Sequence, residues 1–392
     1  MSQKNPDIIL HQGVYKKPVS IVDAVFMITG MTIGAGILGI PYVVSQVGIW
    51  LGVGYIIFLG AVMVALNLMI GEIVVRTKQN FQLPGLVGKY LGPTAKMVMS
   101  LIILLGGLGT LLAYLVGEGE SLFSIFGGVP AWWSIVFWTF GSIFVWRGLQ
   151  SVKLAEKILS ILVISIILGL SLAIAPSMKV VNFNYFHWTN ILMPYGVILF
   201  ALNASPSIAE AHALLPNRPR AFRKALIFGT MIPVLVYLVF ALTVVGVMGK
   251  DTTEIATIGL SGRFGVWVGL LANIFAVFSM GTGFLGLGVA LKQSLVWDWK
   301  VSEFVATLFV ILAPLTLFML GWRDFVSILG IVGGLFLGIE AILILFVYWR
   351  AKRNGDLPTN GYSLSFAHLL TLLIFLVFTF ATVVSIMKIV KF

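Results

Sequence analysis

Residues 30–42 of the chain read GMTIGAGILGIPY. Gly30, Gly34 and Gly36 fall within seven residues, and Pro41 follows them. Glycine costs a helix interior about 1 kcal/mol relative to alanine. Because the stretch lies inside a long apolar run, the helix would be weakest where a bilayer most penalises exposed backbone. The stretch therefore predicts a helix that is broken inside a membrane; the alternative is close packing of an unbroken helix through its small residues.

The composition around this stretch is that of a membrane protein. Of the 392 residues, 59% are hydrophobic and 10% are charged, whereas a soluble domain is about 25% charged. A soluble enzyme, a nucleic-acid-binding domain and a disordered protein are excluded. The chain has no cysteine, which excludes disulfides and thiolate metal sites. The four histidines form no pair at metal-ligand spacing; they are His11, His187, His212 and His368.

Eleven apolar runs are long enough to cross a bilayer, since a helical span needs about 20 residues. The chain is therefore predicted to be an all-α integral membrane protein with eleven transmembrane helices. The first run is too long for a signal peptide and follows 18 mostly polar residues. The runs are residues 19–46, 50–75, 97–117, 130–146, 154–175, 191–214, 224–248, 264–291, 301–320, 325–349 and 364–390.

The basic residues predict the orientation of these spans. With the N-terminus inside, 19 of the 25 Lys and Arg residues fall in inside loops and 6 fall outside, as the positive-inside rule requires. The net charge of +11 is thereby explained without nucleic acid. We expect a multi-pass protein of the plasma membrane with its N-terminus inside and its C-terminus outside.

The loops suggest an internal repeat. The longer loops 77–96 and 249–263 follow spans 2 and 7, and each contains a stretch that suits a short surface helix. Spans 1 and 6, also five apart, are both interrupted. Two tandem units of five spans must have opposite topology, as in many secondary transporters, although the loop lengths alone are equally consistent with coincidence. The predicted segments are 1–18 (N-terminal), 19–175 and 191–349 (the two repeats) and 364–392 (an additional span 11).

The second interruption is LFALNASPSIAEAH, residues 199–212. Pro206 removes a backbone donor and clashes with the preceding turn. Asn203, Ser205 and Ser207 flank it and can bond freed backbone groups or a ligand. The alternative is an ordinary proline kink.

Paired interruptions in two halves of a membrane protein point to a central transport site. The N–H groups that begin a half-helix attract an anion such as a carboxylate. The carbonyls that end one suit an ammonium group or a cation. Together they can hold a zwitterion without any charged side chain.

Three stretches resemble a known family. Residues 30–42 are similar to the first-helix signature of bacterial tryptophan/tyrosine-type permeases, within the amino acid/auxin permease family. Residues 193–240 and 280–295 resemble the sixth to eighth helices of that family. The resemblance implies a LeuT-type fold of five plus five inverted helices with one extra helix, helices 1 and 6 being discontinuous, and cation-driven uptake of an amino acid.

The resemblance also assigns residues to the substrate. One group holds the carboxylate, a second lines the other side of the site, and a tyrosine of span 3 covers the substrate, unless it is simply a packed membrane tyrosine. These residues are Thr32, Ile33, Gly34, Ala35 and Gly36; Leu202, Asn203, Ala204 and Ser205; and Tyr114. The chain departs from the family at Gly30, Leu202, Lys292 and Gln293, which leaves open both the aromatic preference and the coupling ion.

Either Na⁺ or H⁺ serves as the coupling ion on this interpretation. Ser279 and Thr282 are three residues apart in span 8, so their hydroxyls share a helix face. With carbonyls near Gly30 and Ile33 they offer oxygens to Na⁺, unless they bond back to their own helix. Glu340 lies within span 10 and is the candidate proton carrier, because an intramembrane carboxylate is expensive and is retained for function.

The remaining acids are placed near the ends of spans. Asp23, Glu72 and Glu210 lie near inner ends, where they serve as gate residues or, for Glu72 and Glu210 more simply, as anchors paired with nearby basic residues. Glu118 and Glu120 lie at the outer end of span 3, where we expect them to be solvated.

The leading function is symport of a neutral amino acid, aromatic or small, by alternating access. The alternative is an amino-acid-sensing transceptor with little flux. A channel would show a ring of charge or a filter, and an intramembrane enzyme would show clustered catalytic groups; neither is visible. No cofactor beyond the coupling ion is expected. The expected partners are the amino acid and the bilayer, and the chain is expected to act as a monomer or as an oligomer of such units.

Overall fold

The computed structural model describes residues 20–79, 81–147, 153–215, 218–297, 299–358 and 362–390. The predicted N-terminal segment 1–18 lies outside the described residues. Within them the chain forms helices and no strand. The helices are α2 (Ile21–Thr32), α3 (Gly36–Val47), α4 (Ile49–Val75), α5 (Leu83–Leu91), α6 (Pro93–Phe126), α7 (Pro130–Arg147), α8 (Lys153–Ile174), α9 (Met193–Ala201), α10 (Ser205–Leu214), α11 (Pro219–Met248), α12 (Ala256–Phe264), α13 (Val266–Trp297), α14 (Glu303–Met319), α15 (Phe325–Ile331), the π-helix η6 (Val332–Phe336), α16 (Leu337–Asn354) and α17 (Ala367–Val390).

Every predicted apolar run contains a helix or a pair of half-helices. Among the described residues, seven helices are long and apolar enough to cross a membrane, or eight when the bent pair α2 and α3 counts as one span. Two further apolar helices, Ile161–Ser177 and Glu303–Met319, are shorter. An all-helical membrane protein is therefore confirmed, and the number of eleven crossings stays a prediction.

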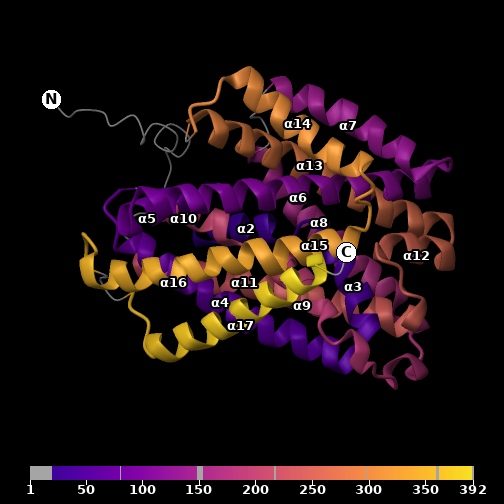
Figure 1. The fold of residues 1–392 in the computed structure, drawn as a ribbon. Coiled ribbons are helices and arrows are strands. Elements are labelled where there is room, and N and C mark those ends of the chain that lie inside the picture. The colour runs from indigo at the N-terminus through magenta and orange to yellow at the C-terminus, as the bar shows by residue number, and fades with distance from the viewer. Residues whose placement is uncertain are drawn as a thin grey trace.

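The short helices expected in the two longer loops are present. Helix α5 and helix α12 have nine residues each, and they lie at opposite ends of the bundle (Figure 1). Below, these ends are called the α5 end and the α12 end. Two tandem units of opposite orientation would place α5 and α12 at opposite ends of the bundle. The bounds of those units stay a prediction.

The half-helices occupy the centre of the bundle. Helices α2 and α10 lie toward the α5 end, and α3 and α9 lie toward the α12 end (Figure 1). Helix α2 packs against α10, α3 packs against α9, and α11 contacts both α2 and α3. The two interruptions therefore meet at mid-depth.

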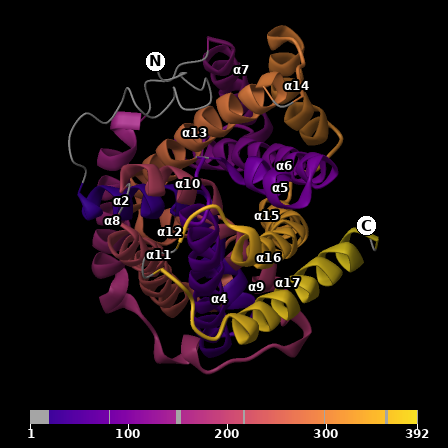
Figure 2. The same cartoon turned by 90° about the vertical axis from the view of Figure 1, so that its left-hand side faces the viewer.

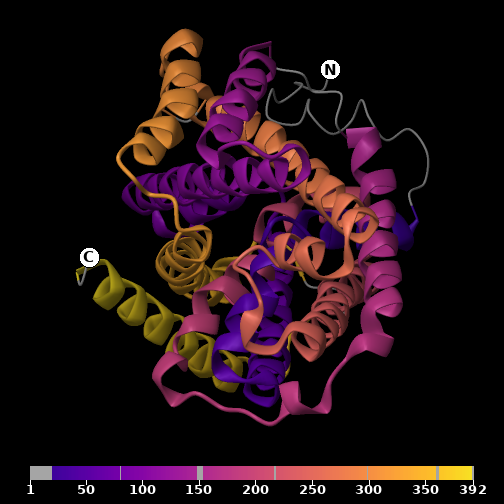
Figure 3. The ribbon, with the colours of Figure 1, turned by 90° about the vertical axis from the view of Figure 1, so that its right-hand side faces the viewer.

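The other helices surround this centre. Viewed from the α5 end, α17 lies at the periphery, where it packs against α16, η6 and α4 (Figure 2). Viewed from the α12 end, residues 175–192 run along the outside of the bundle between α8 and α9 (Figure 3). The long helix α6 packs against α13 and α7.

Gly48 forms the tight junction between α3 and α4. Its φ of 97° is unfavourable for residues that carry a Cβ. A Cβ at this position would also collide with the Tyr185 carbonyl of the peripheral segment. Glycine is thus required here both for backbone conformation and for space.

Candidate functional site

The first interruption lies between α2 and α3, which are bent by 59°. Helix α2 ends with the Ile33 N–H donating to the Thr29 carbonyl at 2.9 Å. In the described chain, neither the Ala35 N–H nor the Gly36 N–H donates a backbone hydrogen bond. The start of α3 therefore presents two main-chain donors, as the glycine-rich sequence predicted.

The second interruption lies between α9 and α10. Pro206 has no N–H, so the Leu202 carbonyl has no helical donor four residues further on. The Asn203 side chain replaces part of the lost pattern, because its Oδ1 accepts from the Ser205 N–H at 3.1 Å. The break predicted from the proline is thus a gap of three residues, Leu202 to Ala204.

Tyr237 of α11 bridges the two interruptions. Its hydroxyl lies within donating distance, 2.9 Å, of both the Thr32 carbonyl at the end of α2 and the Ala201 carbonyl at the end of α9. Tyr237 is completely buried. Sequence reasoning missed this residue because a tyrosine in an apolar helix is typical of a packed core; the available signal was its hydroxyl, which needs a partner when buried.

The two broken helices also touch directly. A Cβ on Gly36 would lie 2.6 Å from the Ala201 Cα. The start of α3 and the end of α9 are therefore in backbone contact, and only glycine fits at position 36.

Gly34 and Tyr114 face one another across the site. A Cβ on Gly34 would meet only the Tyr114 hydroxyl within 4 Å, at an ordinary contact distance of 3.6 Å. Of the ten residues predicted to bind substrate, Gly34 and Asn203 are partly exposed and the others are buried. The region next to Gly34, beneath Tyr114, is thus the open side of the first interruption.

Glu340, predicted as a proton carrier, lies against the second interruption. The Ser205 hydroxyl lies 2.5 Å from Glu340 Oε1 and 2.7 Å from Asn203 Oδ1. The Glu340 side chain is buried, and it follows the π-helix η6 by four residues. Single-turn π-helices are frequent at functional sites. The structure therefore brings together residues that the sequence placed in separate substrate and coupling groups.

The residues predicted to bind sodium near the end of α2 are not joined by hydrogen bonds to those on α13 in the described chain. Thr282 donates to the Phe278 carbonyl of its own helix at 2.8 Å. Helix α2, which carries Gly30, packs against α8, α10 and α11, and no bond in the described chain joins Gly30 or Ile33 to Ser279 or Thr282. A sodium site at these residues stays a prediction.

The three predicted gate residues differ in their surroundings. Asp23 belongs to the capping box of α2, where it accepts from the Ser20 N–H at 3.1 Å. Glu72 is completely buried. Glu210 is partly exposed and makes no hydrogen bond or ion pair within the described residues.

Glu72 accepts hydrogen bonds from three neighbours. Arg76 approaches one oxygen at 2.8 Å, and the Tyr348 hydroxyl and the Leu364 N–H each donate to the other at 3.0 Å. The carboxylate thus connects α4 with α16 and with the segment before α17, which supports the role of an anchor. A gating role for Asp23, Glu72 or Glu210 stays a prediction.

The expectation that Glu118 is solvated is wrong. Its side chain is completely buried, because α6 continues to Phe126 instead of ending at residue 117. Glu120 is partly exposed. In the loop before α12, burial and the nearby Asp324 carboxylate raise the pKa of Glu254.

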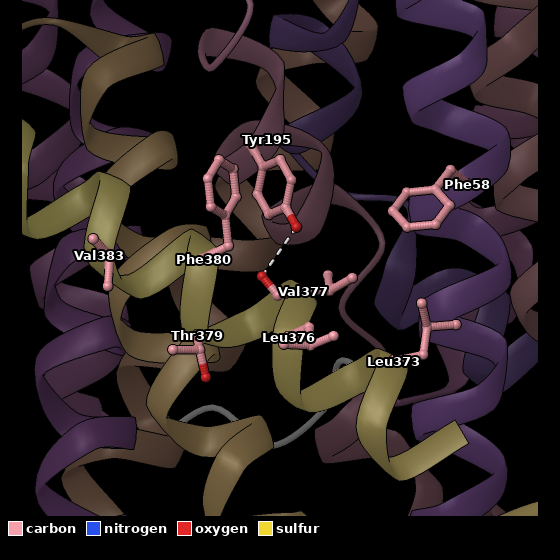
Figure 4. Close-up of a pocket in the computed structure, with 8 residues that line it drawn as sticks. All are labelled: Phe58, Tyr195, Leu373, Leu376, Val377, Thr379, Phe380 and Val383. Carbon is pink, nitrogen blue, oxygen red and sulfur yellow. Dashed lines mark hydrogen bonds between the residues drawn. The ribbon is translucent and has the colours of Figure 1, made fainter. Parts of the chain in front are cut away.

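An apolar groove of about 640 Å³ lies on the periphery, away from the interruptions. It runs between Phe58 of α4, Tyr195 of α9 and the exposed face of α17, and the Tyr195 hydroxyl donates to the Val377 carbonyl at 3.0 Å (Figure 4). None of its lining residues is charged. The groove therefore lacks the groups that a zwitterion requires, and the broken helices remain the candidate site.

Comparison with solved structures identifies the fold. The chain superimposes on the crystal structure of MhsT in complex with L-phenylalanine with a TM-score of 0.62, over 94% of this chain and 98% of that chain, at 15% sequence identity. The LeuT-like fold expected from the resemblance is thus confirmed.

Comparison with characterised proteins finds transporters of similar length. The chain is 26% identical over 353 residues to glutamine transporter 2 of Aliivibrio fischeri, covering 85% of this chain and 90% of that protein. It is 22% identical to tyrosine-specific transport system 1 of Haemophilus influenzae (86% and 90% covered) and 25% identical to tyrosine-specific transport system 2 of the same organism (89% and 92%).

The sequence profile of the tryptophan/tyrosine permease family matches residues 17–386. The match spans both interruptions and nearly all of the described helices. The prediction of a membrane amino acid transporter, and not an enzyme, is confirmed by this match. With its two broken helices in contact at the centre of a LeuT-like bundle, the chain belongs to the tryptophan/tyrosine permease family.

Proposed function

We propose that this protein is a proton-coupled symporter of a neutral amino acid, with an aromatic one, tyrosine, as the leading substrate. The observation that carries the proposal is the contact of Glu340 with Ser205 at the second broken helix. Two relatives are named as tyrosine-specific and one as a glutamine transporter. Tyrosine and glutamine are both neutral amino acids, which agrees with a site built from main-chain groups.

The main chain would bind the two charged ends of the substrate. The Ala35 and Gly36 N–H groups, with the dipole of α3, suit the carboxylate. The Leu202 carbonyl, which has no helical donor, suits the ammonium group. The substrate side chain would then occupy the open side of Gly34 beneath Tyr114.

The hydrogen bonds around Ser205 favour a proton on Glu340. Asn203 Oδ1 accepts from the Ser205 N–H, so the side-chain oxygen of Asn203 faces Ser205. This oxygen can accept a hydrogen bond from the Ser205 hydroxyl but cannot donate one. The Ser205 hydroxyl has a single proton and two oxygens within bonding distance. An ionised carboxylate only accepts, whereas a protonated one donates. The arrangement is therefore fully satisfied when Ser205 donates to Asn203 and protonated Glu340 donates to Ser205.

This arrangement supports a coupling mechanism by alternating access. Protonation from the side of high proton concentration completes the bonds around Ser205 and orders the interruption to which substrate binds. Loss of the proton on the other side leaves an unpaired charge next to α10 and weakens the site. The proton and the amino acid thereby favour the same conformations, as coupling requires.

Uptake into proteoliposomes tests the proposal. We expect an inward proton gradient to drive accumulation of labelled tyrosine without Na⁺, and other neutral amino acids in a panel to compete. Glu340→Gln should lose the stimulation by the proton gradient, whereas the matched variant Glu210→Gln should keep it. Uptake driven by a Na⁺ gradient alone, or tyrosine binding without any flux, would contradict the proposal; the second result would indicate a transceptor.

We also propose that the α5 end faces the cytoplasm and that the protein works as a monomer in the plasma membrane. Because the chain has no cysteine, single introduced thiols are unambiguous labels. In intact cells, an impermeant maleimide should label Arg263→Cys near the α12 end and leave Gln79→Cys near the α5 end unlabelled. Labelling of Gln79→Cys and not of Arg263→Cys would show that the α5 end faces the outside of the cell.

A further inference from the structure

Glu118 is a buried acid that the proposed mechanism does not use. It lies on α6, its side chain is 0% exposed, and neither carboxylate oxygen has a hydrogen-bond partner in the described chain. An unpaired buried charge costs far more than a buried neutral group. The residue therefore requires a ligand that the surrounding side chains do not supply.

The surroundings of Glu118 contain other unsatisfied oxygens. Helices α6 and α13 pack along one another, and Gly281 of α13 leaves room for the carboxylate: a Cβ there would lie 3.2 Å from Glu118 Oε1. Further along the same two helices, Ser121 Oγ and Asn273 Oδ1 are also buried without partners. The α6–α13 seam, defined by these four residues, thus contains buried side-chain oxygens that have no hydrogen-bond partner in the described chain.

Charged groups do not compensate for the carboxylate. On the helices that pack against α6, Lys292 of α13 pairs with Glu303 of α14 at 2.8 Å, near the α5 end. Burial raises the pKa of Glu254 before α12, and the negative charges of Asp324 before α15 and of Glu120 on α6 itself contribute to this.

The other charged residues of the helices packed against α6 lie at helix ends or have partners elsewhere. Lys89 of α5 pairs with Asp356. Glu340 of α16 lies against Ser205, and the remaining charged residues of α16 are at its C-terminal end. Arg147 ends α7 and Arg263 lies in the last turn of α12, and both are exposed. Glu118 forms no ion pair with a charged side chain of the described residues.

The seam is connected to the candidate substrate site through Tyr114. Tyr114 precedes Glu118 by one helical turn, so the two residues share a face of α6. The Tyr114 ring packs on Gly283 of α13, and its hydroxyl faces Gly34. Glu118 therefore lies one turn from the substrate-facing tyrosine, toward the α12 end.

We propose that Glu118 is a second proton-binding group of this transporter, separate from Glu340. A proton is the ligand that Glu118 lacks: the ionised carboxylate is a buried charge with no donor beside it, whereas the neutral acid carries no charge. The proton binds directly to a carboxylate oxygen, so the charge is removed with no other reactant. Only the timing of proton exchange at Glu118 rests on the proposed transport cycle.

Infrared difference spectroscopy of the purified protein in lipid tests the proposal without any transport. We expect the wild type at neutral pH to show, beside the band of the protonated Glu340 proposed above, a second C=O stretch of a protonated acid, with the downshift that deuterium exchange produces. Glu118→Gln should lose this band, and the matched variant Glu120→Gln, two residues away on the same helix, should keep it. Glu118→Asp should retain a band at a shifted frequency.

The outcomes separate this inference from the proposed function. A spectrum of Glu118→Gln identical to that of the wild type would overturn the second proton site, even if Glu340 controls uptake. A band that only Glu118→Gln removes would support it, even if Glu340→Gln leaves the coupling unchanged. Absence of the band, together with a Na⁺-dependent rise in melting temperature that Glu118→Gln abolishes, would replace the proton with a sodium ion and overturn the proposal.

Discussion

The Tyr237 hydroxyl lies 2.9 Å from the main-chain carbonyl of Thr32, at the point where the first broken helix stops. The same hydroxyl lies 2.9 Å from the Ala201 carbonyl, where the second broken helix stops. The single hydroxyl proton of Tyr237 is thus shared between backbone carbonyls that both interruptions release. The bilayer would otherwise leave these carbonyls unpaired, at a cost of several kcal/mol each in hydrocarbon.

Removing this hydroxyl should weaken the protein at its centre. We expect Tyr237→Phe to lower the free energy of unfolding by about 1–3 kcal/mol, the usual cost of an unsatisfied buried group, and to weaken substrate binding. Tyr195→Phe is the matched control, because it removes one hydroxyl bond to the peripheral helix α17 and should leave substrate binding unchanged. Thermal unfolding and binding calorimetry measure both effects. Equal loss of binding in the two variants would contradict the bridging role.

Glycines two residues apart should respond in opposite ways. Gly36→Ala places a methyl group 2.6 Å from the Ala201 Cα, and overpacking of this kind costs about 1–3 kcal/mol. Gly34→Ala has room and should fold normally, whereas Gly34→Val should remain folded and lose substrate binding because its methyl groups fill the open side of the site. Melting temperature and tyrosine binding distinguish the three variants. Normal tyrosine uptake by Gly34→Val would argue against the assigned site.

Substitutions of Glu72 and Glu210, both near the α5 end, should differ in their effect on the free energy of unfolding. Glu72→Gln leaves the Arg76 guanidinium without its counter-charge, and breaking a buried pair costs about 3–5 kcal/mol. Glu210→Gln should change stability little, since Glu210 has no partner in the described chain. Chemical denaturation in detergent compares the two variants. Similar midpoints would show that the bonds around Glu72 do not anchor the helices.

Asp356, in the loop after α16, gives a pH-dependent prediction. A hydrogen bond from the Lys89 side chain, with a second from the Lys78 N–H, lowers the pKa of Asp356. A lowered pKa means that folding favours the ionised form, so its contribution is present above the unfolded value of about 3.9 and is lost as the pH falls below it. We expect Asp356→Asn to melt below the wild type at pH 7, with a difference that shrinks in acid.

Asp251→Asn is the control for this measurement. Asp251 is exposed near the α12 end, and the described chain gives it no hydrogen bond. Its variant should melt with the wild type at every pH. A constant difference between wild type and Asp356→Asn across the pH range would rule out the ion pair as its cause.

Local features of the sequence predicted the interruptions well. The clustered glycines lower the helix propensity of their own stretch, and Pro206 removes a backbone donor from its own helix. Each break is therefore predictable from one short stretch of sequence. The short helices α5 and α12 were visible for the same reason. The breaks and the helices are properties of neighbouring residues and need no knowledge of packing.

Contacts between distant residues were not predictable in this way. Glu340 and Ser205 are 135 residues apart, and nothing in either stretch indicates that they meet. Tyr237 was missed and the burial of Glu118 was predicted wrongly, because the role of each depends on what packs opposite it. In a chain this apolar, hydropathy identifies nearly every helix but gives no preference for one neighbour over another.

The backbone contact of Gly36 with Ala201 ties two half-helices into one mechanical unit. Because Gly36 has no side chain, α3 and α9 are in backbone contact at this point, and neither can slide past the other without steric collision. During a transport cycle we therefore expect them to travel together as a rigid pair, while rearrangement concentrates at their junctions with α2 and α10. Spin labels on α3 and α9 would then report a fixed separation throughout turnover, and labels that straddle either junction would report a changing one.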